Sequence, residues 1–487
     1  EDTFKYPKAG EENAKVSFHI VDTETGEIQD IDLGEYEYLP RLQWTNKENI
    51  VSVQSMNRHQ DSLKLHFVDV DKLTAENILT KTDDAYIEVN DYLTFLADNS
   101  FIWTSENSGW RHLYHYNADG SLDDQITEGN WTVTDYYGYD EDDRRVFYQS
   151  TENGNVNRCV YSVKINGKRT RDLATQEGTN AADFSADYSK FINTFSSIKT
   201  PARFTLHKAR NGDLIRKIKD NQDLVDKLSQ YNTAEKEIFT LEINGNELNM
   251  WMMKPSDFDA SKEYPLFMYQ YSGPGSQQVN NSFAGSNDFW FQMLANQGYI
   301  VACVDGRGTG LKGRDFKKVT QEELGKFELA DQKSAAMKLG DRDYIDAERI
   351  GIWGWSYGGF MAANALFQAN DVFDMAISVA PVTSWRFYDT IYTERYMTTP
   401  QENASGYDEN SPITHVDEFK KGDFLLVHGS ADDNVHFQNT MQLVEALIQA
   451  NKQFDWRVYP DKNHGIYGGN TRLHLYTLMT DFIQEKL

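Results

Sequence analysis

The sequence GWSYGGF at residues 354–360 places one small hydroxyl between glycines and aromatic residues. Residues 349–353 before it are β-branched and aromatic, as in a buried strand, and residues 360–367 after it are alanine-rich with a helical period. A Gly-x-Ser-x-Gly motif between a strand and a helix is typical of a nucleophile elbow, because residues without a Cβ let strand and helix pass closely. A serine in an ordinary glycine-rich turn is the alternative. The flanking pattern favours the elbow and predicts Ser356 as a nucleophile.

A nucleophilic serine needs a base, and the base needs a carboxylate that orients it. In hydrolases built on an α/β sheet these groups follow one another in the order Ser, acid, His. Asp432 comes after an apolar stretch at 424–428, and His464 comes after a strand-like stretch at 457–460. Both would lie at the carboxyl ends of strands, where open α/β sheets carry catalytic loops. Taken singly, Asp432 could cap a helix and His464 could be a surface histidine, but their order after an elbow predicts a catalytic triad.

Neighbouring residues leave one choice open, because chemistry alone does not separate Asp432 from Asp433 as the acid. Two other histidines are rejected as the base. His428 lies at a strand end beside the acid, and His436 lies where a helix is expected to start.

Acyl transfer also needs hydrogen-bond donors aimed at the tetrahedral oxygen. The backbone N–H of Tyr357, directly after the nucleophile, is one predicted donor. The loop at 271–275 follows an early strand of the same half and begins with Tyr271, whose phenol is the second predicted donor.

The bulk composition excludes several classes of protein. A chain of 487 residues is too long for a single core, and its net charge of −27 argues against nucleic-acid binding. Cys159 and Cys303, the only cysteines, stand in different regions, so a disulfide framework is excluded. No apolar run approaches the roughly 18 residues of a membrane-spanning helix.

The first half of the chain repeats a short alternating strand followed by a polar turn that usually contains glycine. The repeats follow one another at steps of 45 to 48 residues, which is typical of propeller blades with several strands each. A β-sandwich with accidental spacing is the alternative. The five predicted repeat strands cover residues 18–22, 65–69, 113–117, 160–164 and 205–209.

The pattern changes after a short amphipathic stretch at 223–228. From about residue 234, apolar strands alternate with helical segments such as 328–338 and 436–450, which predicts a parallel sheet covered by helices. The fold class is therefore a β-propeller portion at 1–228 followed by an α/β-hydrolase domain at 234–487. The five predicted strands of the sheet are 264–269, 299–304, 350–353, 375–379 and 424–428.

Together these residues resemble the prolyl oligopeptidase family of serine peptidases, and within it the dipeptidyl peptidases. The resemblance covers essentially all of 234–487 and is looser over the first half. The motifs that carry it are GWSYGG at 354–359, DGRG at 305–308, HGSADDNVHF at 428–437, YDTIYTERYM at 388–397 and HGI at 464–466, with YPKAG at 6–10 and GWRH at 109–112.

The resemblance implies a role for each matching residue. Ser356 would be the nucleophile, Asp432 rather than Asp433 the orienting acid, His464 the base, and Tyr271 an oxyanion donor. Asn434 would hold a substrate carbonyl, and no metal or other cofactor is implied. A flat apolar ring such as proline fits an aromatic slot that offers no polar partner. The residues implied to line that slot are Tyr357, Val382, Trp385, Tyr388, Tyr392 and Val435. On spacing alone, Tyr388 and Tyr392 would instead be one face of a core helix.

One feature of the family is missing from its expected place. Dipeptidyl peptidases of this kind hold the free amine of the substrate with a pair of glutamates on a propeller-domain helix. Neither the pair at 11–12 nor the pair at 322–323 has such a setting. Only about 17 residues precede the first repeat strand, so we expect the chain to lack the first part of its propeller. A partner fragment or an uncleaved precursor would supply the remaining blades and the amine-binding carboxylates.

The leading hypothesis is a serine exopeptidase that removes N-terminal dipeptides ending in proline or alanine. A tripeptidyl or acylaminoacyl peptidase of the same family is the second hypothesis. A propeller that serves as a binding module beside an inactive hydrolase is the third. The resemblance further implies a homodimer and an exported bacterial protein, although residues 1–4 show no basic and apolar signal segment.

Overall fold

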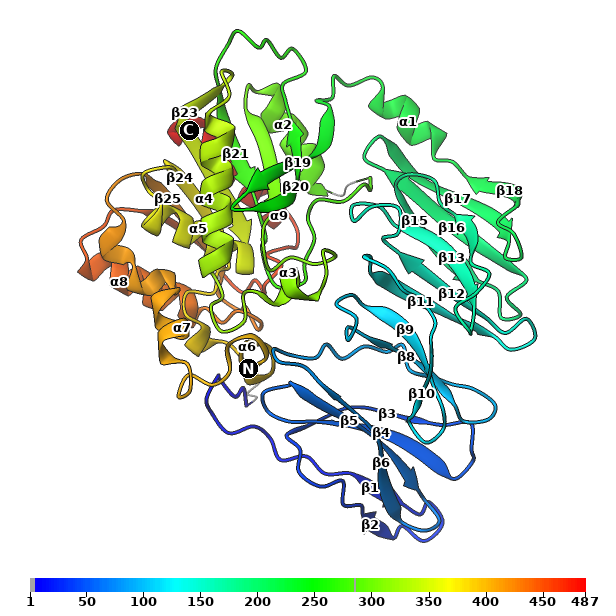
Figure 1. The fold of residues 1–487 in the computed structure, drawn as a ribbon. Coiled ribbons are helices and arrows are strands. Elements are labelled where there is room, and N and C mark those ends of the chain that lie inside the picture. The colour runs from blue at the N-terminus through cyan, green and yellow to red at the C-terminus, as the bar shows by residue number, and fades with distance from the viewer. Residues whose placement is uncertain (1–4, 284–285) are drawn as a thin grey trace.

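A computed structural model describes residues 5–283 and 286–487 of the chain, so the prediction about residues 1–4 lies outside it. A series of small antiparallel sheets follows an arc beside one larger sheet that is flanked by helices (Figure 1). In the described part of the chain, no helix is both long and apolar enough to cross a membrane.

The first half forms one two-stranded sheet and four sheets of four strands each, as expected for propeller blades. The strand from each predicted repeat is present, and in the four larger sheets it is the third strand of its blade. The two-stranded sheet holds β1 (His19–Val21) and β2 (Ile28–Asp30). The next two blades hold β3 (Tyr38–Trp44), β4 (Ile50–Met56), β5 (Ser62–Asp69) and β6 (Thr74–Thr82), then β7 (Thr94–Phe95), β8 (Phe101–Ser105), β9 (His112–Tyr116) and β10 (Leu122–Gln125). The last two hold β11 (Val133–Asp140), β12 (Arg145–Ser150), β13 (Cys159–Lys164) and β14 (Arg171–Ala174), then β15 (Thr179–Phe184), β16 (Lys190–Ser197), β17 (Thr200–Lys208) and β18 (Leu214–Lys219).

Three of the glycines that follow the repeat strands lie where neighbouring blades touch. Gly120, Gly167 and Gly212 each follow the third strand of a blade, have a positive φ, and approach the backbone at the fourth strand of the preceding blade. A Cβ on Gly120 would lie 2.8 Å from the carbonyl carbon of Ile78, and one on Gly212 would lie 2.5 Å from the Leu173 oxygen. Any larger residue would force the blades apart, so the repeated glycine is a packing requirement as well as a turn signal.

The second half contains one eight-stranded sheet in the order β19-β20-β22-β21-β23-β24-β25-β26. The strands from β21 to β26 pair in parallel, which confirms the predicted parallel sheet. An antiparallel pair, β19 and β20, extends one edge and was not predicted. The strands are β19 (Lys236–Ile243), β20 (Asn246–Met253), β21 (Tyr264–Tyr269), β22 (Ile300–Asp305), β23 (Ile345–Trp355), β24 (Met375–Val379), β25 (Asp423–Gly429) and β26 (Asp455–Tyr459).

Helices cover both faces of this sheet, and each face buries its own apolar cluster. The predicted helical stretches correspond to α4 and α8. The helices are α1 (Gln222–Leu228), which links the two halves, then α2 (Ser286–Asn296), α3 (Arg314–Lys318), α4 (Lys326–Gly340), α5 (Tyr357–Gln368), α6 (Thr390–Met397), α7 (Ala404–Glu409), α8 (Gln438–Gln449) and α9 (Thr471–Lys486). Because parallel strands end at the same edge, the loops after β23, β25 and β26 are brought together.

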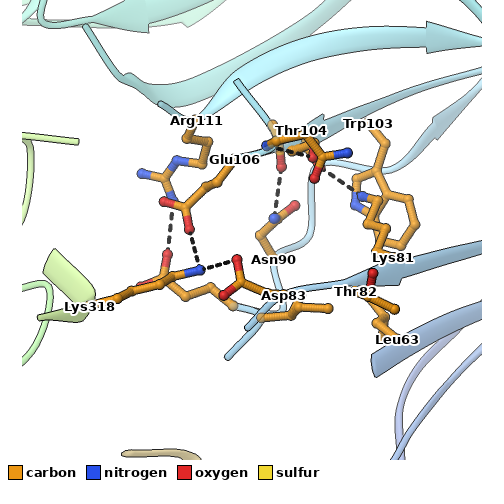
Figure 2. A pocket seen from close by; sticks show the side chains of 14 residues that line it. Leu63, Lys81, Thr82, Asp83, Asn90, Trp103, Thr104, Glu106, Arg111 and Lys318 are labelled. Carbon is orange, nitrogen blue, oxygen red and sulfur yellow. Dashed lines mark hydrogen bonds and ion pairs between the residues drawn. The ribbon is translucent and has the colours of Figure 1, made fainter. Parts of the chain in front are cut away.

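A buried group of ion pairs joins the blades to the hydrolase half at α3. Figure 2 shows Lys318 between the carboxylates of Asp83 and Glu106, at 2.8 and 3.0 Å, beside a cavity of about 40 Å³. Lys317 pairs with Glu88 at 2.9 Å. Loss of water alone would lower the pKa of Lys317, but Glu88 and Glu106 outweigh that effect and raise it. The Lys317 amine is therefore held charged between the two halves. Removing either Lys317 or its carboxylate partner would leave a buried charge unpaired.

Candidate active site

The chain turns sharply from β23 into α5 at Ser356, whose φ is 61° and ψ is −119°. A Cβ on Gly354 would lie 2.6 Å from Gly358 Cα, and one on Gly358 would lie 2.5 Å from the Gln270 oxygen. Only glycine fits at either position, so the motif has the geometry of a nucleophile elbow. The turn lifts a half-buried serine side chain above the carboxyl edge of the sheet.

Two donors converge on Ser356. Burial raises the pKa of the Tyr271 phenol, and the nearby Ser356 side chain opposes that rise, so the two side chains lie close together. Tyr357 is the first residue of α5, and a backbone N–H at that position has no partner within its helix. Both groups that were predicted as oxyanion donors therefore lie beside the same side chain.

His464 and Asp432 meet over the same edge. Asp432 Oδ2 lies 2.7 Å from His464 Nδ1. The indole N–H of Trp355 donates to the backbone oxygen of His464 at 3.0 Å, so the histidine loop is tied to the residue just before Ser356. The side chain of Asp432 is buried whereas Asp433 is exposed. Geometry thus directs Asp432, and not Asp433, toward the histidine.

The Asp432 carboxylate is held by four donors. Its Oδ1 accepts the backbone N–H groups of Asn434 and Val435 at 3.0 Å each, and its Oδ2 faces His464 and His428. Burial opposes ionisation, but the hydrogen bonds from His428 and His464 outweigh it and lower the pKa of Asp432 to about 2. The acid is therefore ionised and fixed in direction at any pH above about 3.

His428 is buried and contacts the same carboxylate oxygen of Asp432 as His464 does. Its Nε2 lies 3.1 Å from Asp432 Oδ2 and 2.8 Å from the Val435 oxygen, and its Nδ1 lies 2.7 Å from the Thr440 hydroxyl. Both ring nitrogens are thus engaged inside the protein. The sequence analysis rejected His428 as the base because it lies at the end of the strand that leads to the acid, but the pattern did not indicate its contact with Asp432.

The six residues that were predicted to line a proline slot belong to one apolar cluster, together with Tyr271. The rings of Tyr357 and Tyr392 lie 5.3 and 5.9 Å from that of Trp385. Tyr388 and Tyr392 are partly buried and stand edge to face at 5.4 Å. Tyr388 donates a hydrogen bond to the side-chain oxygen of Asn434, which lies next to the Asp432 loop. The aromatic cluster therefore adjoins the predicted catalytic groups.

The sequence patterns did not indicate one buried carboxyl group beside this cluster, that of Glu328. Tyr357 Oη donates to Glu328 Oε1 at 2.6 Å, and the backbone N–H of Gly325 donates to Oε2 at 3.0 Å. Burial raises the pKa of Glu328 to about 7, although the hydrogen bond from Tyr357 opposes the rise. The only local signal was a glutamate in the first turn of a helix, which is the usual position of a capping residue.

Within residues 5–283 and 286–487, no group of three or more His, Cys, Asp or Glu side chains is placed to hold a metal ion.

Comparisons with known proteins identify the family of the chain. Residues 286–487 match the family model described as prolyl oligopeptidase family, and residues 1–202 match the N-terminal region of dipeptidyl peptidase IV. The crystal structure of Porphyromonas gingivalis dipeptidyl peptidase 4 matches with a TM-score of 0.95 and 43% identity, over 99% of this chain and 69% of that one. The chain belongs to the prolyl oligopeptidase family. Its fold, a blade portion followed by an α/β-hydrolase domain, is the one that the sequence predicted.

Two fungal members of this family extend the comparison. A protein named "Probable dipeptidyl-aminopeptidase B" from Pyrenophora tritici-repentis is 36% identical over 97% of this chain and 56% of its own length. A protein of the same name from Phaeosphaeria nodorum is 35% identical over 98% of this chain and 55% of its own. The chain thus spans about half the length of these curated relatives. The matches lend no support to a separate fragment that carries further blades.

The buried carboxyl of Glu328 predicts a specific pH dependence of stability. The folded protein binds this proton more tightly than the unfolded chain, whose glutamate has an ordinary pKa of 4.5. The free energy of unfolding should therefore fall by about 3 kcal/mol as pH rises from about 4.5 to about 7, and stay lowered above that. Glu328→Gln cannot ionise and should lose this component. Urea unfolding at pH 5.5 and pH 8 measures it, with the exposed Glu348→Gln as the matched control. An unchanged pH dependence in Glu328→Gln would contradict the assignment.

Proposed function

We propose that this protein is a serine exopeptidase that releases dipeptides with proline or alanine as their second residue. The observation that carries the proposal is the contact between Asp432 and His464 beside the elbow of Ser356, with the aromatic cluster adjoining it. The relatives named above are dipeptidyl peptidases or dipeptidyl aminopeptidases.

In this mechanism Ser356 Oγ attacks the carbonyl carbon of the peptide bond while His464 Nε2 takes the hydroxyl proton. Asp432 accepts the Nδ1–H of His464, which fixes the tautomer and stabilises the imidazolium. The C–N bond then breaks, the leaving amine takes the proton from His464, and an acyl-enzyme remains on Ser356. Water repeats the sequence with His464 as base and releases the acyl group as a free acid.

The negative charge on the tetrahedral oxygen is stabilised by the Tyr271 phenol and the Tyr357 backbone N–H. Burial keeps Tyr271 protonated by raising its pKa, so its O–H remains a donor at neutral pH. The rings of Trp385, Tyr388 and Tyr392 would accept the flat pyrrolidine of proline, or the small methyl of alanine, because neither of these side chains carries a hydrogen-bonding group. Asn434, whose side-chain oxygen accepts the Tyr388 hydroxyl, would hold a substrate carbonyl through its amide N–H.

There are two alternative functions, one enzymatic and one not. A tripeptidyl or acylaminoacyl peptidase would share the triad and the slot but release longer or blocked products. A binding module beside an inactive hydrolase would need neither the Asp432–His464 contact nor a phenol at Ser356, so those contacts favour an enzyme. Homodimer formation and export from the cell remain predictions that accompany the peptidase proposal.

Product analysis tests the dipeptidyl peptidase proposal. Incubation with peptides of the type Xaa-Pro-Yaa-Zaa should release Xaa-Pro alone, and N-acetylation of the same peptides should abolish release. Mass spectrometry of the products reads the outcome directly. Release of tripeptides, or faster cleavage of the acetylated peptides, would replace the proposal with one of the two family alternatives.

Substitution of Tyr271 tests the oxyanion assignment. Tyr271→Phe should lower kcat by about 10²- to 10³-fold and leave KM nearly unchanged, because the donor acts on charge that develops only in the transition state. Tyr269→Phe is the matched control, since that phenol donates to Gln278 instead. If KM rises while kcat stays the same, Tyr271 is a wall of the slot and not an oxyanion donor.

A further inference from the structure

The short helix α6 carries one wall of the proposed proline slot. Tyr392 lies within it, Tyr388 lies two residues before it, and its N-cap Asp389 accepts the backbone N–H of Tyr392 at 2.7 Å. With only eight residues, such a helix has little stability of its own and takes its position from what packs around it. The ring of Tyr392 stacks on Trp385, so that side of the helix faces the slot.

A second set of contacts reaches α6 from the turn at 57–61, between β4 and β5 of the propeller. Arg58 Nε and Nη2 donate to Glu394 Oε2 and Oε1 at 2.7 and 2.8 Å. The Glu394 side chain is fully buried, and Arg58 is its only cationic contact among the described ion pairs. A planar two-bond contact of this kind fixes direction as well as distance.

Gln60 in the same turn makes two hydrogen bonds to α6. Its amide donates to the Ile391 oxygen at 2.6 Å, and its side-chain oxygen accepts from Arg395 Nε at 2.8 Å. Gln60 is completely buried and has a φ of 58°, an uncommon backbone conformation for a residue with a Cβ. The turn is therefore held in a strained shape that presents its side chain to the helix.

The segment at 7–13 holds the start and the middle of the same helix. The backbone N–H of Thr390 donates to the Pro7 oxygen at 3.1 Å, and that of Ala9 donates to the Tyr388 oxygen at 3.1 Å. The N–H of Gly10 donates to Glu394 Oε1 at 2.7 Å. Glu394 is thus the point where the turn, the segment and the helix meet.

We propose that the turn at 57–61 and the segment at 7–13 form a clamp that sets the position of α6, with Arg58 and Gln60 as positioning residues for the proline slot. The proposal rests on the proposed function for its specificity readout. Neither residue touches the triad, whose members lie on the loops after β23, β25 and β26. The clamp therefore acts on substrate choice through Tyr388 and Tyr392 and leaves the reactivity of Ser356 alone.

The central variant is Arg58→Met, which keeps an apolar stem and removes the charge. We expect the ratio of kcat/KM for Xaa-Pro over Xaa-Ala substrates to fall about tenfold or more, mainly through KM, because the slot loses the fixed position of its rings. Labelling of Ser356 by a fluorophosphonate should keep its rate within about twofold. Arg58→Lys should recover part of the preference, since it restores charge without the two-bond geometry.

Two further variants separate the clamp from general damage. In Arg58→Met with Glu394→Gln, the stranded buried carboxylate is removed, so the double variant should be more stable than the sum of the two single changes predicts. His59→Ala is the matched control, because His59 lies in the same turn and pairs with Glu402, which is outside α6, at 3.0 Å. It should leave the proline preference unchanged.

Hydrogen exchange supplies a readout that does not need peptidase activity. Amides at 390–397 should exchange at least about tenfold faster in Arg58→Met than in the parent protein or in His59→Ala, while the amides of α5 stay protected. An unchanged exchange rate at 390–397 overturns the clamp, and so does a loss of protection in α5 that matches the loss in α6. If exchange behaves as expected but the parent protein shows no preference for proline, the proposed function fails and the clamp stands.

Discussion

The close approach of Gly354, Gly358 and Gln270 is the constraint on which the site depends. Because β23 and α5 pass within a distance that leaves no room for a Cβ at either glycine, the chain can only connect them through a residue with positive φ. Ser356 occupies that position at a cost of about 1–3 kcal/mol, and the packing of the sheet and helix around it sustains the strain. The strain has a chemical consequence, since it holds the hydroxyl away from the helix and toward the loops that carry the other groups.

Asp432 holds the other loops of the site in place. One buried carboxylate collects donors from its own loop, from the end of β25 through His428, and from the loop after β26 through His464. Each of these donors lowers the free energy of the ionised form, which explains how a charge survives in a buried position. The hydrogen bond from the Trp355 indole to the His464 backbone oxygen then ties the histidine loop to the elbow.

Local patterns in the sequence predicted much of this architecture. The elbow, the parallel strands and the repeat strands each depend on residues within a few positions of one another, and the repeated glycines report a contact that recurs in the last three blades. The antiparallel pair β19 and β20 was missed because β19 mixes charged with apolar residues, whereas the buried parallel strands are continuous apolar runs. Contacts such as Arg58 with Glu394 join residues 336 positions apart, so no local spacing encodes them. For Glu328 the capping position was visible, but its contact with Tyr357 depends on how α4 packs against α5.

The account requires that Ser356 be the residue that becomes acylated, and covalent labelling measures this most directly. Reaction with a fluorophosphonate followed by peptide mapping should place one adduct per chain on Ser356, and Ser356→Ala should show none. The same substitution should lower peptide turnover by about 10⁴-fold or more. An adduct of equal yield on another residue of the Ser356→Ala protein, or peptide turnover that survives the change, would contradict the account.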